Sequence, residues 1–185
     1  MKAGVLALQG DFREHAMRFA DLGLAPIEVR TPADLASVDL LAIPGGESTT
    51  IGLLARSAGL VEPIRDRARA GMPILGTCAG LIVLAERVQG GAPLLGLLDV
   101  TAERNAYGRQ LESFEADVTV AGIDAPVRAV FIRAPVVSHV GPAVRVLAEH
   151  EGRPVVVEQG NIVGATFHPE LVGETGLHAY LARKV

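Results

Sequence analysis

The sequence predicts an α/β fold: a single domain over residues 1–185 whose mixed, mainly parallel open sheet is flanked by helices in a three-layer arrangement. In the first half, apolar strand-like runs alternate with helical stretches, which predicts right-handed crossovers between parallel strands. Tryptophan is absent and aromatic residues make up 4% of the chain, so the core must come from Val, Leu, Ile and Ala. Such a core is typical of buried parallel strands. In the second half, short apolar runs separated by Gly, Pro and Asp predict some antiparallel pairing.

The first-half elements follow from apolar periodicity and from turn residues. Residues 3–8 form an apolar run that is too short for the core of a signal peptide, so we interpret it as the first strand. Amphipathic spacing then predicts a helix over 12–22. Gly71 is expected to end a helix, because glycine commonly follows a helix C-terminus. The remaining elements expected here are strands 26–29, 39–43 and 73–76 and helices 48–58 and 62–70.

The second half begins with a helical run over 81–88 and then changes character. Turn residues divide the rest into short strands with little helix between them, and a final helix is expected over 175–183. No internal repeat or linker separates the halves. The expected strands are 94–101, 114–120, 127–132, 144–149, 154–158 and 161–167.

Charge and cysteine content exclude several classes of protein. The net charge is −4, from 17 basic and 21 acidic side chains without a basic cluster, which argues against a nucleic-acid partner. No apolar run approaches the ~18 residues needed to cross a membrane. With one cysteine the chain cannot form an internal disulfide, so we expect a cytoplasmic protein.

The single cysteine lies in a pattern typical of a nucleophile. Cys78 stands in the sequence GTCAG, directly after the strand expected over 73–76 and before a helical run. A tight strand–turn–helix with small flanking residues presents a side chain above the sheet edge. The helix N-terminus also favours a thiolate and an oxyanion. The alternative is a small buried hydrophobic cysteine.

A histidine and a carboxylate follow the strand expected over 161–167. His168, Pro169 and Glu170 would lie at the same sheet edge as Cys78. A cysteine hydrolase needs an imidazole as base and a third group to fix its tautomer. Side chains at i and i+2 of an extended segment point the same way, and Pro169 stiffens the segment. The alternative is a solvated surface pair, and we interpret the other histidines as structural: His15, His139, His150 and His178.

The glycine-rich turn after residue 43 is a candidate anion cradle. It reads PGGESTT, and successive glycines can point backbone N–H groups outward. Ser48 or Thr49 is expected to cap the following helix. No phosphate-loop pattern is present, and no lysine occurs between Lys2 and Lys184. A plain turn with a helix cap is the alternative.

Together these three motifs resemble the class I, triad-type glutamine amidotransferases. Within that group the similarity is to the glutaminase subunit of the two-component pyridoxal 5'-phosphate synthase. It extends from Gly4 to Glu170 and includes LQG at 8–10, REH at 13–15, the stretch 103–117 and VFIRAP at 130–135. The tail after Leu171 matches weakly. No triad residue is altered.

The resemblance implies roles for individual positions. Cys78, His168 and Glu170 match the catalytic triad, while Gly46 and the backbone of Ala79 match the oxyanion hole. The residues matching the glutamine-binding positions are Gly46, Glu47, Ser48, Arg104, Ile132 and Arg133. The resemblance further implies hydrolysis of L-glutamine through a γ-glutamyl thioester, with ammonia channelled to a synthase subunit in vitamin B6 biosynthesis. Such a glutaminase is poorly active until that subunit binds.

Neither a metal nor a cofactor is expected, because no Cys/His cluster has zinc-site spacing. Two other classes of function remain open from the residues themselves. A cysteine peptidase or γ-glutamyl hydrolase of the same fold would keep Cys78 and His168 but act on peptides or conjugates. A non-catalytic redox or binding module could use the cysteine without the His168–Glu170 pair.

Overall fold

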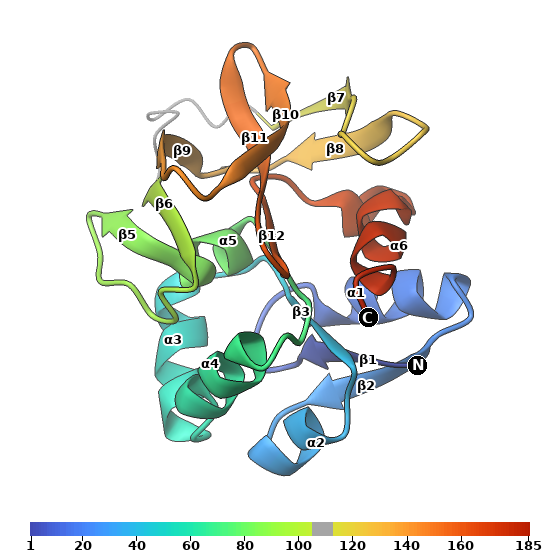
Figure 1. Cartoon of the computed structure of the whole chain (residues 1–185), viewed down its shortest axis with the longest axis vertical. Helices are drawn as coiled ribbons and strands as arrows, with labels where there is room; N and C mark the ends of the chain where they lie inside the picture. The colour runs from blue at the N-terminus through green and yellow to red at the C-terminus, as the bar shows by residue number, and fades with distance from the viewer. Residues whose placement is uncertain (105–112) are drawn as a thin grey trace.

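The computed structural model describes residues 1–104 and 113–185 and centres on a seven-stranded sheet. The strand order is β10-β11-β12-β4-β3-β1-β2 (Figure 1). The five strands from β12 to β2 are parallel, and β11 and β10 continue the sheet in antiparallel pairs. The bounds are β1 Lys2–Leu6, β2 Ala25–Val29, β3 Leu40–Ile43, β4 Ile74–Thr77, β10 Arg145–His150, β11 Arg153–Gln159 and β12 Ile162–Ala165.

Helices cover both faces because the central strands are apolar on both sides. In β3, Leu41 and Ile43 pack into one core cluster with α3 and α4, while Leu40 and Ala42 pack into a second cluster with α1 and α6. All four of these β3 side chains are fully buried. The helices are α1 Phe12–Asp21, α2 Pro32–Ala36, α3 Ser48–Ser57, α4 Val61–Arg69, α5 Ala79–Leu84 and α6 Gly176–Ala182, with a short 3-10 helix, η1, over Pro169–Val172.

Two smaller sheets lie beyond the main one (Figure 1). The first has the order β5-β6-β9 and packs its apolar side into the core cluster described above that contains α3 and α4. The second, β7-β8, packs into the core cluster that contains α1 and α6. Their strands are β5 Ala85–Gln89, β6 Leu98–Glu103, β9 Val136–Val140, β7 Phe114–Val118 and β8 Val127–Phe131.

The expected fold class, its mixed sheet and its two helical layers are confirmed. One expected element was wrong: the helical run 81–88 stops at Leu84, and the chain continues as strand β5. The strand expected over 94–101 begins only at Leu98. Pattern reasoning also missed α2, β9 and η1. Within the described residues, none of the helices has the length and apolarity of a membrane span.

Candidate active site

Three strand ends bring the predicted motifs together. Strands β12, β4 and β3 are adjacent and parallel, so their carboxyl ends share one edge of the sheet. The backbone N–H of Cys78 donates to the carbonyl of Ala165 at 2.9 Å, which ties the cysteine turn to the strand that leads to His168. The site therefore lies at the sheet edge where α/β folds usually bind ligands.

Cys78 occupies a strained turn between β4 and α5. Its φ is 49° and its ψ is −105°, a backbone conformation that residues other than glycine rarely adopt. A side chain at Gly80 would collide with the carbonyl of Ile43, so only glycine lets α5 approach β3 this closely. The expected strand–turn–helix is present, with Cys78 at the turn between β4 and α5. Cys78 is 7% exposed, and its Sγ lies 4.0 Å from the carbonyl oxygen of Ile132.

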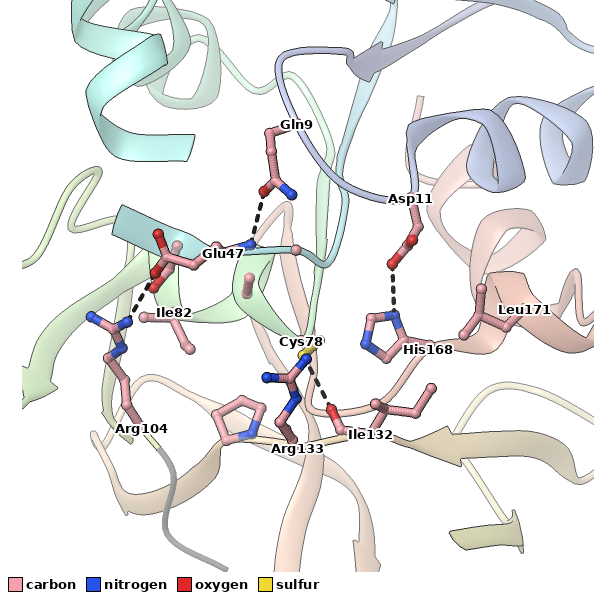
Figure 2. Close-up of a pocket in the computed structure, with 14 residues that line it drawn as sticks. Gln9, Asp11, Glu47, Cys78, Ile82, Arg104, Ile132, Arg133, His168 and Leu171 are labelled. Carbon is pink, nitrogen blue, oxygen red and sulfur yellow. Dashed lines mark hydrogen bonds and ion pairs between the residues drawn. The ribbon is translucent and has the colours of Figure 1, made fainter. Parts of the chain in front are cut away.

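His168 and Glu170 form a buried pair beside this thiol; Figure 2 shows His168 near Cys78. The Nδ1 atom of His168 lies 2.7 Å from Oε1 of Glu170. The two residues meet through the 3-10 turn Pro169–Val172 rather than through the extended segment that the sequence suggested. The backbone N–H of His168 donates to the backbone carbonyl of Val130 at 2.8 Å, which fixes the start of the turn.

The charge on His168 is set by its neighbours. Burial disfavours the imidazolium, but hydrogen bonds and Coulombic attraction from Cys78 and Glu170 outweigh that cost and raise the pKa of His168 to about 10. These contacts therefore favour the imidazolium form of the ring at neutral pH. A positively charged imidazole next to a cysteine is the arrangement found around cysteine nucleophiles.

Asp11 is a site residue that sequence reasoning missed. Its Oδ2 lies 3.4 Å from Nδ1 of His168, the same atom that Glu170 contacts (Figure 2 shows the Asp11–His168 contact). Burial raises the pKa of the Asp11 carboxyl. Asp11, His168 and Glu170 place one potential ligand atom each within 4.8 Å of one another, but Nδ1 of His168 is already engaged with Glu170. The signal that could have found Asp11 is its place just after the first strand, before α1.

The glycine turn after β3 is held by contacts that the sequence did not predict. Gly46 has a φ of +146°, which favours glycine. The N–H of Glu47 donates to Oε1 of Gln9 at 2.8 Å, so Gln9, another missed residue, anchors the turn. The helix cap is Glu47 rather than Ser48 or Thr49, because its carboxylate accepts the N–H groups of Thr49 and Thr50.

Arg104 joins this cap to the far side of the pocket. Its guanidinium lies 3.0 Å from the Glu47 carboxylate and donates to Thr49 Oγ1 at 3.1 Å. Hydrogen bonds from Thr49 and Thr50 lower the pKa of Glu47 to about 2. Glu47 is thus a fixed anion at the pocket mouth. The stretch 103–117, which includes Arg104, lies partly outside the described residues.

The residues expected to bind glutamine converge on one pocket of about 460 Å³. Glu170 contacts His168 but is not among the residues that line this pocket. Figure 2 shows the guanidinium groups of Arg104 and Arg133 and the carboxylate of Glu47 around the space in front of Cys78. The lining is Gln9, Asp11, Gly46, Glu47, Ser48, Cys78, Ala79, Ile82, Arg104, Ile132, Arg133, Pro135, His168 and Leu171.

Comparison with known proteins gives consistent results over nearly the whole chain. Residues 5–185 match the model of the SNO glutamine amidotransferase family. The chain is 52% identical to a protein of Acidothermus cellulolyticus named pyridoxal 5'-phosphate synthase subunit PdxT, over 100% of this chain and 93% of that protein. It is 54% identical to the protein of the same name from Deinococcus radiodurans, over 96% and 94% of the two chains.

Solved structures agree with these relatives. A crystal structure described as that of a glutamine amidotransferase superposes with a TM-score of 0.94 at 47% identity, over 98% of this chain and 97% of that one. A structure of PurLQS from Thermotoga maritima has a TM-score of 0.73 at 20% identity, over 99% and 95% of the chains, which shows a shared fold.

Proposed function

The chain belongs to the SNO glutamine amidotransferase family, and from this we propose that it is the glutaminase subunit of a pyridoxal 5'-phosphate synthase. It hydrolyses L-glutamine to L-glutamate and ammonia with Cys78, His168 and Glu170 as its triad. One observation carries the assignment of the triad: the buried His168–Glu170 pair lies against the thiol in the elbow. A thiol nucleophile, an imidazole and a carboxylate that orients it are the parts that amide hydrolysis by a cysteine requires.

The first half of the reaction forms a thioester. The Cys78 thiolate attacks the side-chain carbonyl carbon of glutamine, and the electron pair of the C=O bond moves onto oxygen. Backbone N–H groups at Gly46 and Ala79 stabilise that oxyanion, since α5 begins at Ala79 and its first N–H groups are free of helix partners. The imidazolium of His168 then protonates the departing nitrogen, and ammonia leaves.

The second half regenerates the thiol. Neutral His168 takes a proton from water, whose oxygen attacks the γ-glutamyl thioester. The C–S bond breaks, glutamate is released and the proton returns to the thiolate–imidazole pair. Glu170 holds Nδ1 of His168 throughout, so that the opposite nitrogen faces the sulfur and the substrate.

The remaining pocket residues suit a free amino acid. Glutamine carries an ammonium and a carboxylate besides its amide. Glu47 offers a carboxylate to the ammonium, and Arg104 and Arg133 offer guanidinium donors to the carboxylate. Ser48 and the Ile132 backbone line the same pocket.

A synthase subunit is the proposed recipient of the ammonia. The relatives from A. cellulolyticus and D. radiodurans are each named as a subunit of pyridoxal 5'-phosphate synthase, which supports a hetero-oligomeric complex for this chain. Ammonia at neutral pH is readily lost as ammonium, so direct transfer would protect it. A single thiol nucleophile that must stay reduced is consistent with a cytoplasmic location.

The decisive experiment measures ammonia released from glutamine by the isolated chain and by the chain mixed with a candidate synthase subunit. Cys78→Ala should reduce turnover roughly 10³-fold or more, because no other cysteine can replace the nucleophile. Peptides and γ-glutamyl conjugates serve as control substrates. Cleavage of those substrates without ammonia release from glutamine, or full activity of Cys78→Ala, would contradict the proposal.

A further inference from the structure

Two buried histidines lie behind the triad, and the mechanism above leaves them unused. His15 comes from α1 and His178 from α6, and both are 0% exposed. Nδ1 of His15 lies 2.8 Å from Nε2 of His178. The ring of Phe19 packs edge-on against His178, so the pair sits inside the apolar layer between the two helices.

The other nitrogen of His15 faces both catalytic segments. Its Nε2 lies 3.0 Å from Oγ1 of Thr77, the residue that precedes the nucleophile. The same Nε2 lies 3.5 Å from Oε2 of Glu170. One imidazole thus contacts the end of β4 and the turn η1, the two elements that must stay in register for the triad to form.

The contacts select one tautomer of His15. Oε1 of Glu170 is occupied by His168, and Oε2 accepts no hydrogen bond from any described residue, so Nε2 of His15 is the nitrogen that can serve it. An ionised carboxylate only accepts, and the Thr77 hydroxyl can accept as well as donate, so a proton on Nε2 suits both neighbours of this nitrogen, at 3.0 and 3.5 Å. Nδ1 of His15 is then bare and accepts from Nε2–H of His178. The opposite tautomer would direct a lone pair at the carboxylate.

Burial favours the neutral form of both rings. Burial lowers the pKa of His15 well below its usual value, and the neighbouring His178 and His168 add to this. Burial, with Arg18 nearby, lowers the pKa of His178 to about 3. Among the described residues, the charged or titratable groups near the His15–His178 pair are Glu170, His168 and Arg18.

Stability alone does not account for this arrangement. Nδ1 of His178 has no hydrogen-bond partner among the described residues, and a buried polar atom without a partner costs about 1–3 kcal/mol. Two apolar side chains of similar volume would avoid that cost. The polar pair is explained if the contact it makes with Glu170 is useful.

We propose that His15 is a positioning residue for the triad: its Nε2–H, shared between Oγ1 of Thr77 and Oε2 of Glu170, keeps the carboxylate oriented so that Oε1 stays on His168, while His178 fixes the tautomer of His15. This inference rests on the proposed amidase mechanism, in which the thiolate–imidazolium pair is the reactive species. Burial raises the pKa of Glu170, so each additional donor helps to keep its carboxylate ionised. An ionised Glu170 in turn stabilises the imidazolium and hence the thiolate.

The test uses the rate at which iodoacetamide alkylates Cys78 as a function of pH. Cys78 is the only cysteine in the sequence, and the assay needs neither glutamine nor a partner. In His15→Leu the pH of half-maximal rate should rise by about one unit, which means an approximately tenfold slower reaction below that pH. His178→Leu should give a smaller rise in the same direction.

Two matched comparisons separate positioning from packing. His15→Gln keeps an N–H donor near the place of Nε2 and should restore the wild-type profile, whereas His15→Asn places its amide near Nδ1 and should not. If His15→Leu fails to fold, the comparison of His15→Gln with His15→Asn still tests the proposal. Leu181→Ala removes a fully buried side chain from the same helix as His178 without touching a polar atom, so it should lower the melting temperature but leave the profile unchanged.

Glutamine kinetics provide the second readout, with the synthase subunit present. His15→Leu should lower kcat about 10- to 100-fold, as is usual when a group that orients a ligand or base is lost, with KM nearly unchanged. An unchanged alkylation profile in folded His15→Leu or His15→Asn, or the same shift in Leu181→Ala, would overturn the inference. If profiles shift as expected but wild type releases no ammonia from glutamine, the proposed function fails and the positioning role stands.

Discussion

His168 lies between two carboxylates that are unequal in burial and distance. Glu170 is buried and meets Nδ1 at 2.7 Å, whereas the half-buried Asp11 approaches the same atom at 3.4 Å. Both stabilise the imidazolium, but the closer and better-shielded Glu170 should dominate, since Coulombic interactions strengthen as distance and effective dielectric constant fall.

This inequality predicts different losses for two similar substitutions. Glu170→Gln should lower kcat/KM on the order of 10²- to 10⁴-fold, because the tautomer of His168 is no longer fixed. Asp11→Asn should cost only about two- to fivefold, the equivalent of ~0.5–1 kcal/mol for a partly exposed ion pair. In both variants the decline of activity on the alkaline side should begin at a lower pH than in wild type. A pH profile of kcat/KM measures this, and equal losses would contradict the ranking.

At this scale the sequence predicted residues that terminate strands and missed residues that support them. The positions of Cys78, His168 and Glu170 at strand ends were predictable because each follows a recognisable strand or turn, and their catalytic roles stay a prediction. Gln9, Asp11 and His15 act through contacts with segments at least 38 residues distant along the chain, and no local pattern reports such contacts. The cap at Glu47 was missed because Ser and Thr, unlike Glu, are among the preferred N-cap residue types.

The elbow depends on how closely α5 approaches β3. A Cβ at Gly80 would meet backbone carbonyls of β3 and the turn after it, whereas a Cβ at Gly52 in α3 would meet only side-chain atoms at ordinary contact distance, the nearest at 3.6 Å. The two glycines occupy neighbouring helices of the same layer, which makes them a matched pair.

Alanine at these two positions should have opposite effects. Gly80→Ala should lower the free energy of unfolding by about 1–3 kcal/mol, as overpacking does, and reduce glutaminase activity by displacing Cys78. Gly52→Ala should raise it by about 0.5–1 kcal/mol, because alanine is the better helix former. Urea unfolding of both variants measures the difference. Equal destabilisation would show that the close approach at Gly80 is not specific to the elbow.

Element boundaries show where local pattern gives way to tertiary structure. The run 81–88 has helical spacing, yet residues after Leu84 pair with β6 and become β5. Pairing with β6 decided the outcome over intrinsic propensity, since most of β5 is exposed. The strand β9 was missed for a similar reason: its burial pattern is only partly alternating, and its pairing partner β6 lies more than 30 residues earlier.

Three histidines make the stability of the whole molecule depend on pH in two directions. His15 and His178 have lowered pKa values, so the unfolded chain binds protons that the native state refuses; stability falls as pH drops from about 6.5 toward 3. His168 has a pKa of about 10, so the native state holds a proton that the unfolded chain releases; stability falls as pH rises from about 6.5 to 10.

Stability should therefore be greatest near pH 6.5. Each histidine changes the free energy of unfolding by up to about 1.4 kcal/mol per pH unit within its window. Urea midpoints measured from pH 5 to pH 9.5 test this. His178→Leu should flatten the acid side and His168→Gln the alkaline side, while a midpoint that rises steadily across the range would refute the assignment.

The two edges of the main sheet lie at β2 and β10, and each is altered in a way that discourages further pairing. In β2, Ala25 N–H and the Val29 carbonyl face β1, so the intervening Pro26 directs its backbone nitrogen outward, where it has no hydrogen to donate. At the other edge the ladder of β10 is interrupted by shifts in register. A foreign strand would find no continuous row of partners on either flank, so crowded or partly destabilised molecules have little opportunity to polymerise through this sheet.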